Sequence, residues 1–412
     1  MTRTVLSIDP LGTPGANGTE LTIVKVVRAP WIVPDQGKAH ALQLAASTLP
    51  AWHEPHAVRL RGQCVRDALA KHPGVARMLD LLPGQTDVTP LYLILSEGEV
   101  ELIGWETLCD QTDAFLSLDQ DQRFPIGRIV EPSHDEARAP SSLRLPIRLM
   151  AIISAIGADG RPEWEHLFDA VKTARASGLE MQFRVLVGDP ALRSLVDQAV
   201  KDPGNADWLS VSHIDAKGSE VVQAISQWKP QIVHVFCHGD AEDTDQWLEL
   251  ATEVDYLQGA TKGSTIVRAS QLARMVDLLP NPWLLTLNAC DTGRAATTIN
   301  SMAHRMVRAG FPAAVAMLEP VNENDAHTVT RAFYGRMFQL LEQVSTTLKT
   351  AEEAPFEWLR PMSAVREALV EDHGADPTSA REWSLPVLYV RGVAPFYFRK
   401  PIANVSPHEA EE

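Results

Sequence analysis

The chain has 412 residues, 45% of them hydrophobic and 22% charged, which is typical of soluble globular proteins. At about 100–200 residues per domain, this length is enough for two or three domains. The formal net charge is −16. Such an acidic surface disfavours direct binding to nucleic acid or to anionic membranes, because like charges repel.

The cysteines and the N-terminus bear on the cellular compartment. Four cysteines, Cys64, Cys109, Cys237 and Cys290, are spread along the chain without a CxxC pair, which argues against a disulfide framework. Residues 1–10 lack the basic and apolar regions of a secretory signal, and no apolar run has the length of a membrane span. We therefore expect a cytoplasmic protein whose thiols stay reduced and can react.

The first third of the chain contains several predicted elements. Residues 1–20 hold several glycines and prolines and predict a mobile lead-in. Residues 21–27 and 91–95 predict strands, and apolar residues at helical spacing over 58–82 predict helix. The polar segment 131–142 contains two prolines and predicts a boundary between the two halves of the chain.

Strands and helices alternate regularly after this boundary. Strands are predicted at 147–154, 181–187, 232–236, 283–287, 313–318 and 385–390, with helical patterns between them. We expect Asp189, followed by Pro190, and later Ser219, Ser270 and Asp325 to cap helices. Strands separated by single helices predict an α/β fold with a mostly parallel sheet and helices on both of its faces.

Two of the predicted strands are each followed at once by a reactive side chain. One leads into His238 and Gly239, and the other leads into Cys290, with Gly293 shortly after it. Because neighbouring parallel strands deliver such residues to a shared crevice, the imidazole and the thiol are expected to meet there. A neighbouring imidazole generates the reactive thiolate near neutral pH. This pattern predicts Cys290 as nucleophile and His238 as base, with the backbone N–H groups of Gly239 and Cys290 binding the oxyanion.

The order and spacing of this pair narrow the choice of family. His238 precedes Cys290 by 52 residues, close to the roughly 50 residues between histidine and cysteine in caspases. The order excludes a simple papain-like, class I glutamine amidotransferase or α/β-hydrolase interpretation, because those proteins place the nucleophile before the histidine.

The motifs resemble those of the CHAT family, the branch of caspase-like (clan CD) cysteine peptidases related to separase. Residues 238–239 match the family's His-Gly, residues 288–293 match Asn-Ala-Cys-x-x-Gly, and residues 309–316 match the run Ala-Gly-Phe-Pro-Ala-Ala-Val-Ala. Residues 104–108 are similar to the upstream Pro-Trp-Glu-Leu-Leu, with Gly104 and Thr107 as differences. Glu319 replaces a tryptophan that the family usually has near the primary specificity pocket. The resemblance extends from about Leu21 to Val390.

The resemblance implies both an architecture and an activity. It implies an N-terminal pseudo-caspase-like lobe at 1–145 and a catalytic caspase-like (CHAT) domain at 146–400; we expect residues 401–412 to form a flexible acidic tail. It also implies a cysteine endopeptidase that cleaves a protein substrate through a thioester, with no metal or organic cofactor. A bacterial defence or cell-death system is the implied setting. The chain lacks the repeat or sensor module often fused in this family, so we expect a separate activating partner or ligand.

Nearby histidine and cysteine residues allow other interpretations. Successive side chains of a strand face opposite sides, so Cys237 is expected to point into the core, away from His238. His234 shares the side of His238 and is expected to be a packed strand residue. A zinc site made of His234, Cys237, His238 and Cys290 is conceivable from residue type, but it would need Cys237 and His238 on one side.

Acidic residues follow both the histidine segment and the nucleophile helix. Residues 240–255 contain seven acids and no lysine or arginine: Asp240, Glu242, Asp243, Asp245, Glu249, Glu253 and Asp255. We expect a solvated loop there, with selection of basic substrates or gating of the site as the alternative. Glu319 and Glu323 are candidates for lining a pocket that accepts arginine or lysine.

Two functional alternatives stay open beside the endopeptidase. One is a caspase-like scaffold with a silent site that docks other proteins, although the presence of both His238 and Cys290 argues against it. The other is a thiol hydrolase that acts on small amides.

Overall fold

The computed structural model describes most of the chain. The described residues are 3–11, 21–54, 56–96, 98–119, 121, 123–131, 142–242, 245–289, 296–319, 321–348, 353–392 and 396–399. Cys290 and residues 401–412 therefore lie outside the described residues.

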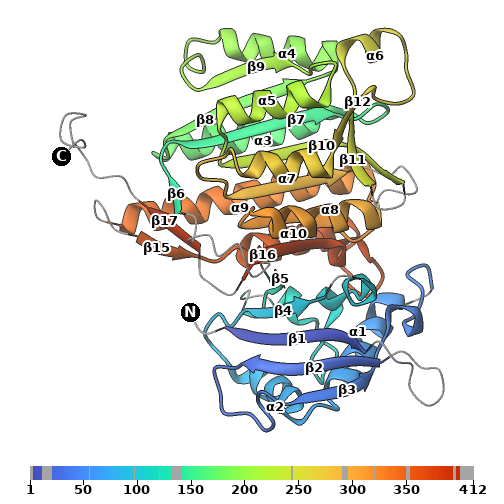
Figure 1. The fold of residues 1–412 in the computed structure, drawn as a ribbon. Helices are drawn as coiled ribbons and strands as arrows, with labels where there is room; N and C mark the ends of the chain where they lie inside the picture. Colours follow the sequence, from blue (N-terminus) through green and yellow to red (C-terminus); the bar gives the residue numbers. More distant parts are fainter. Residues whose placement is uncertain are drawn as a thin grey trace.

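A 14-stranded sheet runs through the whole protein (Figure 1). Its main strand order is β3 (Ala39–Gln43), β2 (Leu21–Arg28), β1 (Thr4–Leu11), β4 (Leu91–Leu95), β5 (Ile126–Val130), β16 (Pro386–Arg391), β14 (Ala313–Met317), β13 (Leu284–Ala289), β10 (Ile232–Glu242), β7 (Ile147–Ser154), β8 (Met181–Val187) and β9 (Leu209–His213). β11 (Asp245–Leu250) pairs with β10, and β12 (Thr265–Arg268) pairs with β11. A separate three-stranded sheet contains β15 (Glu353–Phe356), β17 (Phe396–Arg399) and β6 (Ser142–Arg144).

The large sheet consists of two parallel blocks. β14, β13, β10, β7, β8 and β9 are mutually parallel, and so are β16, β5, β4 and β1. The blocks meet where β16 pairs antiparallel with β14. The N-terminal strands thus extend the sheet of the second half across β16, while the division near residue 145 stays a prediction.

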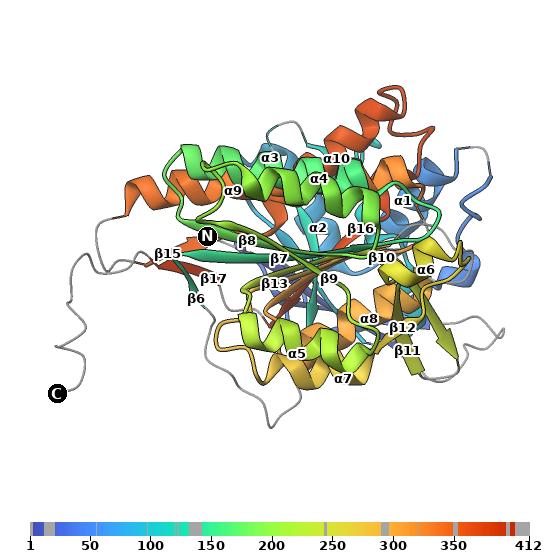
Figure 2. The same ribbon diagram turned by 90° about the horizontal axis from the view of Figure 1, so that it is seen from above.

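Helices cover both faces of the sheet, which confirms the predicted α/β architecture. They are α1 (Ala57–Leu69), α2 (Pro73–Leu81), α3 (Gly160–Ala176), α4 (Pro190–Lys201), α5 (Gly218–Trp228), α6 (Glu253–Leu257), α7 (Ala269–Val276), α8 (Ala296–Ala309), α9 (Glu323–Thr347) and α10 (Leu359–Asp372). Figure 2 shows α3, α4 and α9 on one face and α5, α7 and α8 on the other. The face that carries α3 and α9 is the one that matters for the site.

The prediction of a mobile lead-in at residues 1–20 is wrong for residues 4–11. This segment is β1, and it pairs with both β2 and β4. Val5, Leu6 and Ile8 are almost completely buried, so the gain from burying apolar side chains decides the structure of this segment. The glycine-rich residues 12–20 lie outside the described part of the chain.

Helix caps were predicted with mixed success. Asp189 caps α4 as expected, and its Oδ1 accepts from the backbone N–H of Ala191 at 2.8 Å. The other three predictions are wrong: the N-caps are Lys217, Arg268 and Asn322, two or three residues before Ser219, Ser270 and Asp325. Asn322 is itself a favourable cap, and its Oδ1 accepts from the N–H of Asp325 at 2.9 Å.

The expected solvated loop at 240–255 is instead largely a β-hairpin. β10 continues to Glu242 and pairs antiparallel with β11. Leu248 and Leu250 are buried. The apolar residues interspersed among the acids thus bury one side of the hairpin, and acid content alone did not reveal this.

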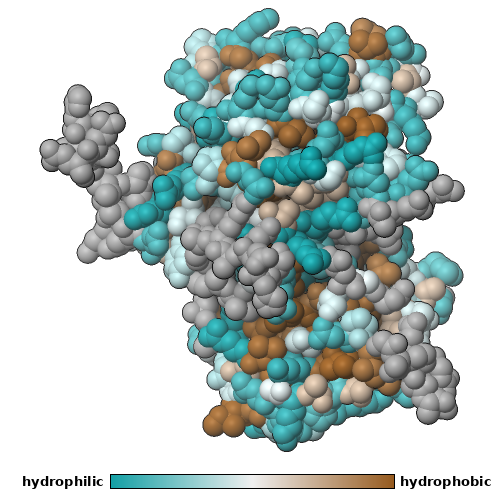
Figure 3. Space-filling view, in the orientation of Figure 1, coloured by the Kyte–Doolittle hydropathy of each residue, from teal (hydrophilic) through white to brown (hydrophobic). Residues whose placement is uncertain are grey.

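Hydrophilic residues cover much of the surface on the face seen in Figure 3, with hydrophobic residues scattered among them. Within the described ranges, no helix is both long enough and apolar enough to cross a bilayer.

Candidate active site

His238 lies where β10 leaves the parallel sheet. The parallel pairing of β10 with β7 and β13 extends as far as Cys237, which stands opposite Ser154 and Ala289. From His238 onward the strand pairs antiparallel with β11, and Glu249 is the partner of His238. His238 is therefore the first residue beyond the carboxyl edge of the parallel strands, where crevices form in open α/β sheets.

The imidazole of His238 is oriented by a backbone carbonyl. Its Nε2 lies 2.7 Å from the carbonyl oxygen of Ile156. Because a carbonyl only accepts hydrogen bonds, Nε2 must carry the hydrogen. Nδ1 is buried and has no hydrogen-bond partner among the described residues. The ring is therefore held in the tautomer that leaves Nδ1 free to accept a proton.

The position of the thiol follows only from the strand before it. Cys290 lies outside the described residues, directly after Ala289, the last residue of β13. β13 is the immediate parallel neighbour of β10, with Asn288 opposite Phe236. Contact between the imidazole and the thiol stays a prediction, and so do the oxyanion roles of Gly239 and Cys290.

Sequence reasoning missed Ile156 as a partner of the histidine. The contact uses only its backbone carbonyl, so the type of side chain gives no signal. Topology gives one: residues 155–159 connect β7 to α3 at the same edge of the sheet as His238.

The hairpin that carries His238 is anchored against the ends of β7 and β8. The Ser154 hydroxyl donates to the carbonyl of Ala251 at 2.9 Å and accepts from its N–H at 2.6 Å. Gly188 lies so close that a Cβ there would be 1.9 Å from the same carbonyl oxygen. Only glycine therefore fits at position 188 in this arrangement.

A buried polar network lies on the α3 and α9 face of the sheet, behind the histidine. The Glu163 carboxylate on α3 is fully buried and accepts four hydrogen bonds. Its donors are His234 Nε2 at 2.7 Å, Asn288 Nδ2 at 2.8 Å, His327 Nδ1 at 2.8 Å and Thr330 Oγ1 at 2.6 Å. His234 is thus a packed strand histidine, as expected, but it belongs to a network that the sequence did not reveal.

Hydrogen bonding keeps Glu163 ionised inside the protein. Burial alone would raise the pKa of its carboxyl group. The hydrogen bonds and positive charge of His234 and His327 outweigh burial and lower the pKa to about 2. A buried carboxylate is tolerated when its oxygens are satisfied in this way.

The zinc alternative is not supported. The thiol of Cys237 is buried and donates to the backbone carbonyl of His238 at 3.0 Å. Both ring nitrogens of His234 have partners, Glu163 and the Tyr334 hydroxyl. No group of three ligating side chains suited to a metal occurs among the described residues.

The two acidic pocket candidates already have partners. The carboxylate of Glu319 accepts from Arg381 at 2.6 Å. Glu323 accepts from the backbone N–H of Asp159 at 3.1 Å. Both residues lie near the carboxyl edge of β14. Their role in substrate selection stays a prediction, because a basic substrate side chain would have to displace these partners.

Comparison with known proteins gives the family. The model of the CHAT domain matches residues 61–358, which is most of the chain. The chain belongs to the CHAT family. No curated protein matches its sequence.

Solved structures similar to this CHAT protein are distant. Two are Saccharomyces cerevisiae separase–securin complexes, each 12% identical over 75% of this chain, with TM-scores of 0.39 and 0.37. The match spans only 16% and 15% of those separase chains. A third is the pneumococcal O-GlcNAc transferase GtfA with UDP and GlcNAc, with 14% identity, a TM-score of 0.26 and coverage of 73% of this chain and 58% of that one. At TM-scores this low, none of these likenesses identifies an activity.

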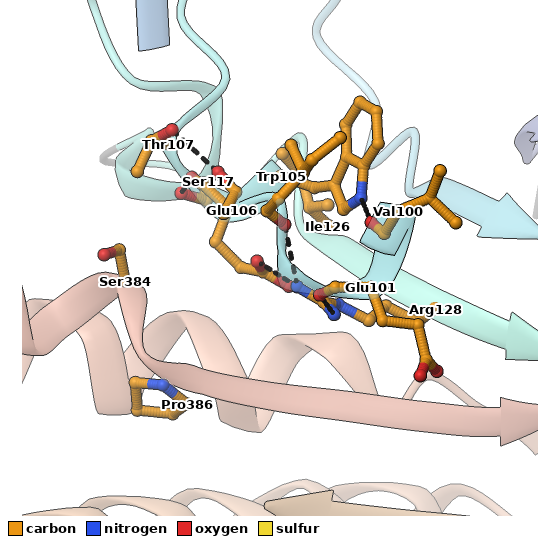
Figure 4. Close-up of polar contacts among 12 residues, drawn as sticks. Val100, Glu101, Trp105, Glu106, Thr107, Ser117, Ile126, Arg128, Ser384 and Pro386 are labelled. Carbon is orange, nitrogen blue, oxygen red and sulfur yellow. Dashed lines mark hydrogen bonds and ion pairs between the residues drawn. The ribbon is translucent and has the colours of Figure 1, made fainter. Parts of the chain in front are cut away.

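The tryptophan–glutamate element of this CHAT chain has a structural role. Figure 4 shows the Glu106 carboxylate facing the guanidinium of Arg128 on β5, and both side chains are fully buried. Their closest atoms, Nη2 and Oε2, are 2.8 Å apart. Trp105 Nε1 donates to the carbonyl of Val100 at 2.8 Å. The element therefore fixes the loop before β5, the strand that pairs with β16.

A second buried pair joins the N-terminal part of the chain to α8, the helix that follows the Cys290 segment. Glu101 is hydrogen-bonded to Nδ1 of His304 on α8, and both side chains are buried. The N-terminal part of the CHAT chain thus touches the helix that begins six residues after Cys290.

Proposed function

We propose that this protein is a cysteine endopeptidase that uses His238 as base and Cys290 as nucleophile. The proposal rests on one observation: the ring of His238 is fixed through Nε2, while its buried Nδ1 lacks a partner among the described residues. A buried, unpartnered ring nitrogen costs free energy, so a functional reason for it is expected. A thiol delivered by the neighbouring strand would supply the missing partner.

The reaction follows from these roles. Nδ1 of His238 takes the proton of the Cys290 thiol, and the thiolate attacks the carbonyl carbon of the scissile peptide bond. The charge on the resulting oxyanion is stabilised by the N–H groups of Gly239 and Cys290. His238 returns the proton to the leaving amine as the carbon–nitrogen bond breaks and a thioester forms. Water, activated by His238, then hydrolyses the thioester and frees the thiol.

The Ile156 carbonyl assists this cycle. Hydrogen bonds from a charged donor are stronger than neutral ones. The bond from Nε2 therefore strengthens when His238 becomes an imidazolium, although a neutral carbonyl stabilises the cation less than a carboxylate would.

We also propose that the substrate is a protein, that the enzyme works in the cytoplasm, and that a partner or ligand controls it, in a bacterial defence or cell-death system. The CHAT family assignment supports these points.

Labelling with a peptidyl acyloxymethyl ketone tests the proposal. Such a probe should modify Cys290 in the wild type and not in Cys290→Ala or His238→Ala, both of which should keep the fold. Cys64 is exposed, so Cys64→Ser removes background labelling. A protein that shows no selective modification of Cys290 would be a silent scaffold. A labelled protein that cleaves small amides but no protein in a search for new N-termini would be an amide hydrolase.

A further inference from the structure

We propose that Glu163 is a positioning residue that holds together the three segments on which the catalytic pair depends. This inference rests on the proposed function. The three segments are β10 with His238, β13 leading to Cys290, and the 155–159 connection with the Ile156 carbonyl.

Glu163 reaches β10 through His234. His234 lies on the same side of the strand as His238, four residues earlier, and its Nε2 donates to Glu163 Oε1 at 2.7 Å. Its other ring nitrogen lies 3.2 Å from the Tyr334 hydroxyl, which donates to Thr286 Oγ1 at 3.0 Å. Because both nitrogens are bound, the ring cannot turn without breaking two buried hydrogen bonds.

Glu163 reaches β13 through Asn288, the second residue before Cys290. The Asn288 amide is fixed by Nδ2, which donates to Glu163 Oε1 at 2.8 Å, to the Ala326 carbonyl at 2.8 Å and to Thr330 Oγ1 at 2.9 Å. Its Oδ1 is buried without a partner among the described residues. The end of β13 is therefore tied to α3 and α9 by one amide group.

Glu163 reaches the Ile156 carbonyl through its own helix. It lies in the first turn of α3, which Asp159 caps, directly after the 155–159 connection. A carboxylate that fixes the first turn of α3 also limits movement of that connection. The same side chain thus ties the carbonyl, the histidine strand and the nucleophile strand to each other.

Glu163 also reaches α9, through His327. His327 donates to Glu163 Oε2 through Nδ1, and its Nε2 is buried without a partner among the described residues. Glu163 is therefore hydrogen-bonded to α9 through His327 as well as through Thr330.

The inference can be tested without a substrate or activator. The experiment measures the rate at which iodoacetamide alkylates Cys290, as a function of pH, in the Cys64→Ser background. Glu163→Ala and Asn288→Ala should each slow alkylation near neutral pH by about tenfold or more, since small misplacements of reacting groups are this costly. The midpoint of the pH profile should move towards about 8.5, the value of a free thiol. The alkylation rate of the double variant should be within about threefold of the rate of the slower single variant, because both substitutions act on the same contact between imidazole and thiol.

Glu106→Ala is the matched control. Glu106 is also a fully buried, ion-paired carboxylate, so its loss should lower stability while leaving the alkylation midpoint unchanged. If Glu163→Ala does not fold, Thr330→Val serves instead, because it keeps shape and carboxylate but removes a hydrogen bond to each of Glu163 and Asn288. For Thr330→Val we expect alkylation to slow about threefold and the midpoint of the pH profile to move in the same direction as in Glu163→Ala.

Two results would overturn the inference: a wild-type rate and midpoint in the Glu163 or Thr330 variant, or strictly additive effects of Glu163→Ala and Asn288→Ala. A failure of the proposed function would give a different result. In that case Cys290 of the wild type would itself be alkylated as slowly as Cys290 of His238→Ala.

Discussion

Nε2 of His238 and the carbonyl oxygen of Ile156 are 2.7 Å apart, and this contact decides which ring nitrogen can act as a base. The donor must be Nε2, so the lone pair is on Nδ1, which is buried at the carboxyl edge of the sheet. A histidine placed there without such an acceptor could adopt either tautomer and either ring orientation. The contact therefore fixes the tautomer and the ring orientation that the proposed base requires.

Replacing the base should separate orientation from proton transfer. In His238→Gln the side-chain amide can still donate to a carbonyl but cannot accept the thiol proton. We expect alkylation of Cys290 at pH 7 to slow by about 100-fold or more, the typical contribution of a positioned base. His213→Gln, which changes an exposed histidine, should match the wild type. Equal rates for the two variants would remove His238 from the mechanism.

Gly188→Ala should disturb the hairpin that carries His238. The new Cβ would overlap the Ala251 carbonyl oxygen, and the backbone must move to relieve this overlap. We expect a loss of about 1–3 kcal/mol in the free energy of unfolding, together with slower labelling of Cys290. Urea unfolding and probe labelling measure the two effects. Gly178→Ala is the control, because a Cβ there meets nothing within 4 Å and only backbone strain at its φ of +99° is expected.

Breaking the Arg128–Glu106 pair should destabilise the junction between the N-terminal strands and β16. Burial by itself lowers the pKa of Arg128, but attraction to Glu106 outweighs burial and raises it, so the guanidinium stays charged. Arg128→Met should lower the free energy of unfolding by about 3–5 kcal/mol, because it leaves the Glu106 carboxylate buried and unpaired.

Removing both charges tests that explanation. Arg128→Met combined with Glu106→Leu should recover much of the lost stability in urea unfolding, since no unpaired charge remains. A double variant as unstable as the single one would show that packing, and not the charge, matters at this junction.

Glu163 should make stability depend on pH in the acidic range. Its folded-state pKa of about 2 lies below the ordinary value of 4.5, so the folded state favours the ionised form. The resulting stabilisation is complete above about pH 4.5 and is lost as the pH falls towards 2. The difference in unfolding free energy between wild type and Glu163→Gln should therefore shrink steadily as the pH is lowered from 5 to 3 in urea titrations. A difference independent of pH would contradict the ionised, hydrogen-bonded state of this carboxylate.

Local sequence patterns determined much of the fold. The strands at 147–154 and 181–187 were predicted with the bounds that β7 and β8 have. Fully buried parallel strands are continuous apolar runs, and the helices between them have regular apolar spacing, so period and length suffice. The same patterns placed His238 at the carboxyl edge of the parallel sheet, because parallel strands bring their carboxyl ends to one edge, although β10 itself continues to Glu242.

Only the tertiary structure decided how the site is built around that residue. The Ile156 carbonyl and the Glu163 network join residues 71 to 167 positions apart in the chain. A backbone carbonyl has no sequence signature, and a glutamate on a helix resembles a surface residue until its partners are in place. Local patterns report burial and period, whereas the partner of a buried polar group depends on which elements pack together.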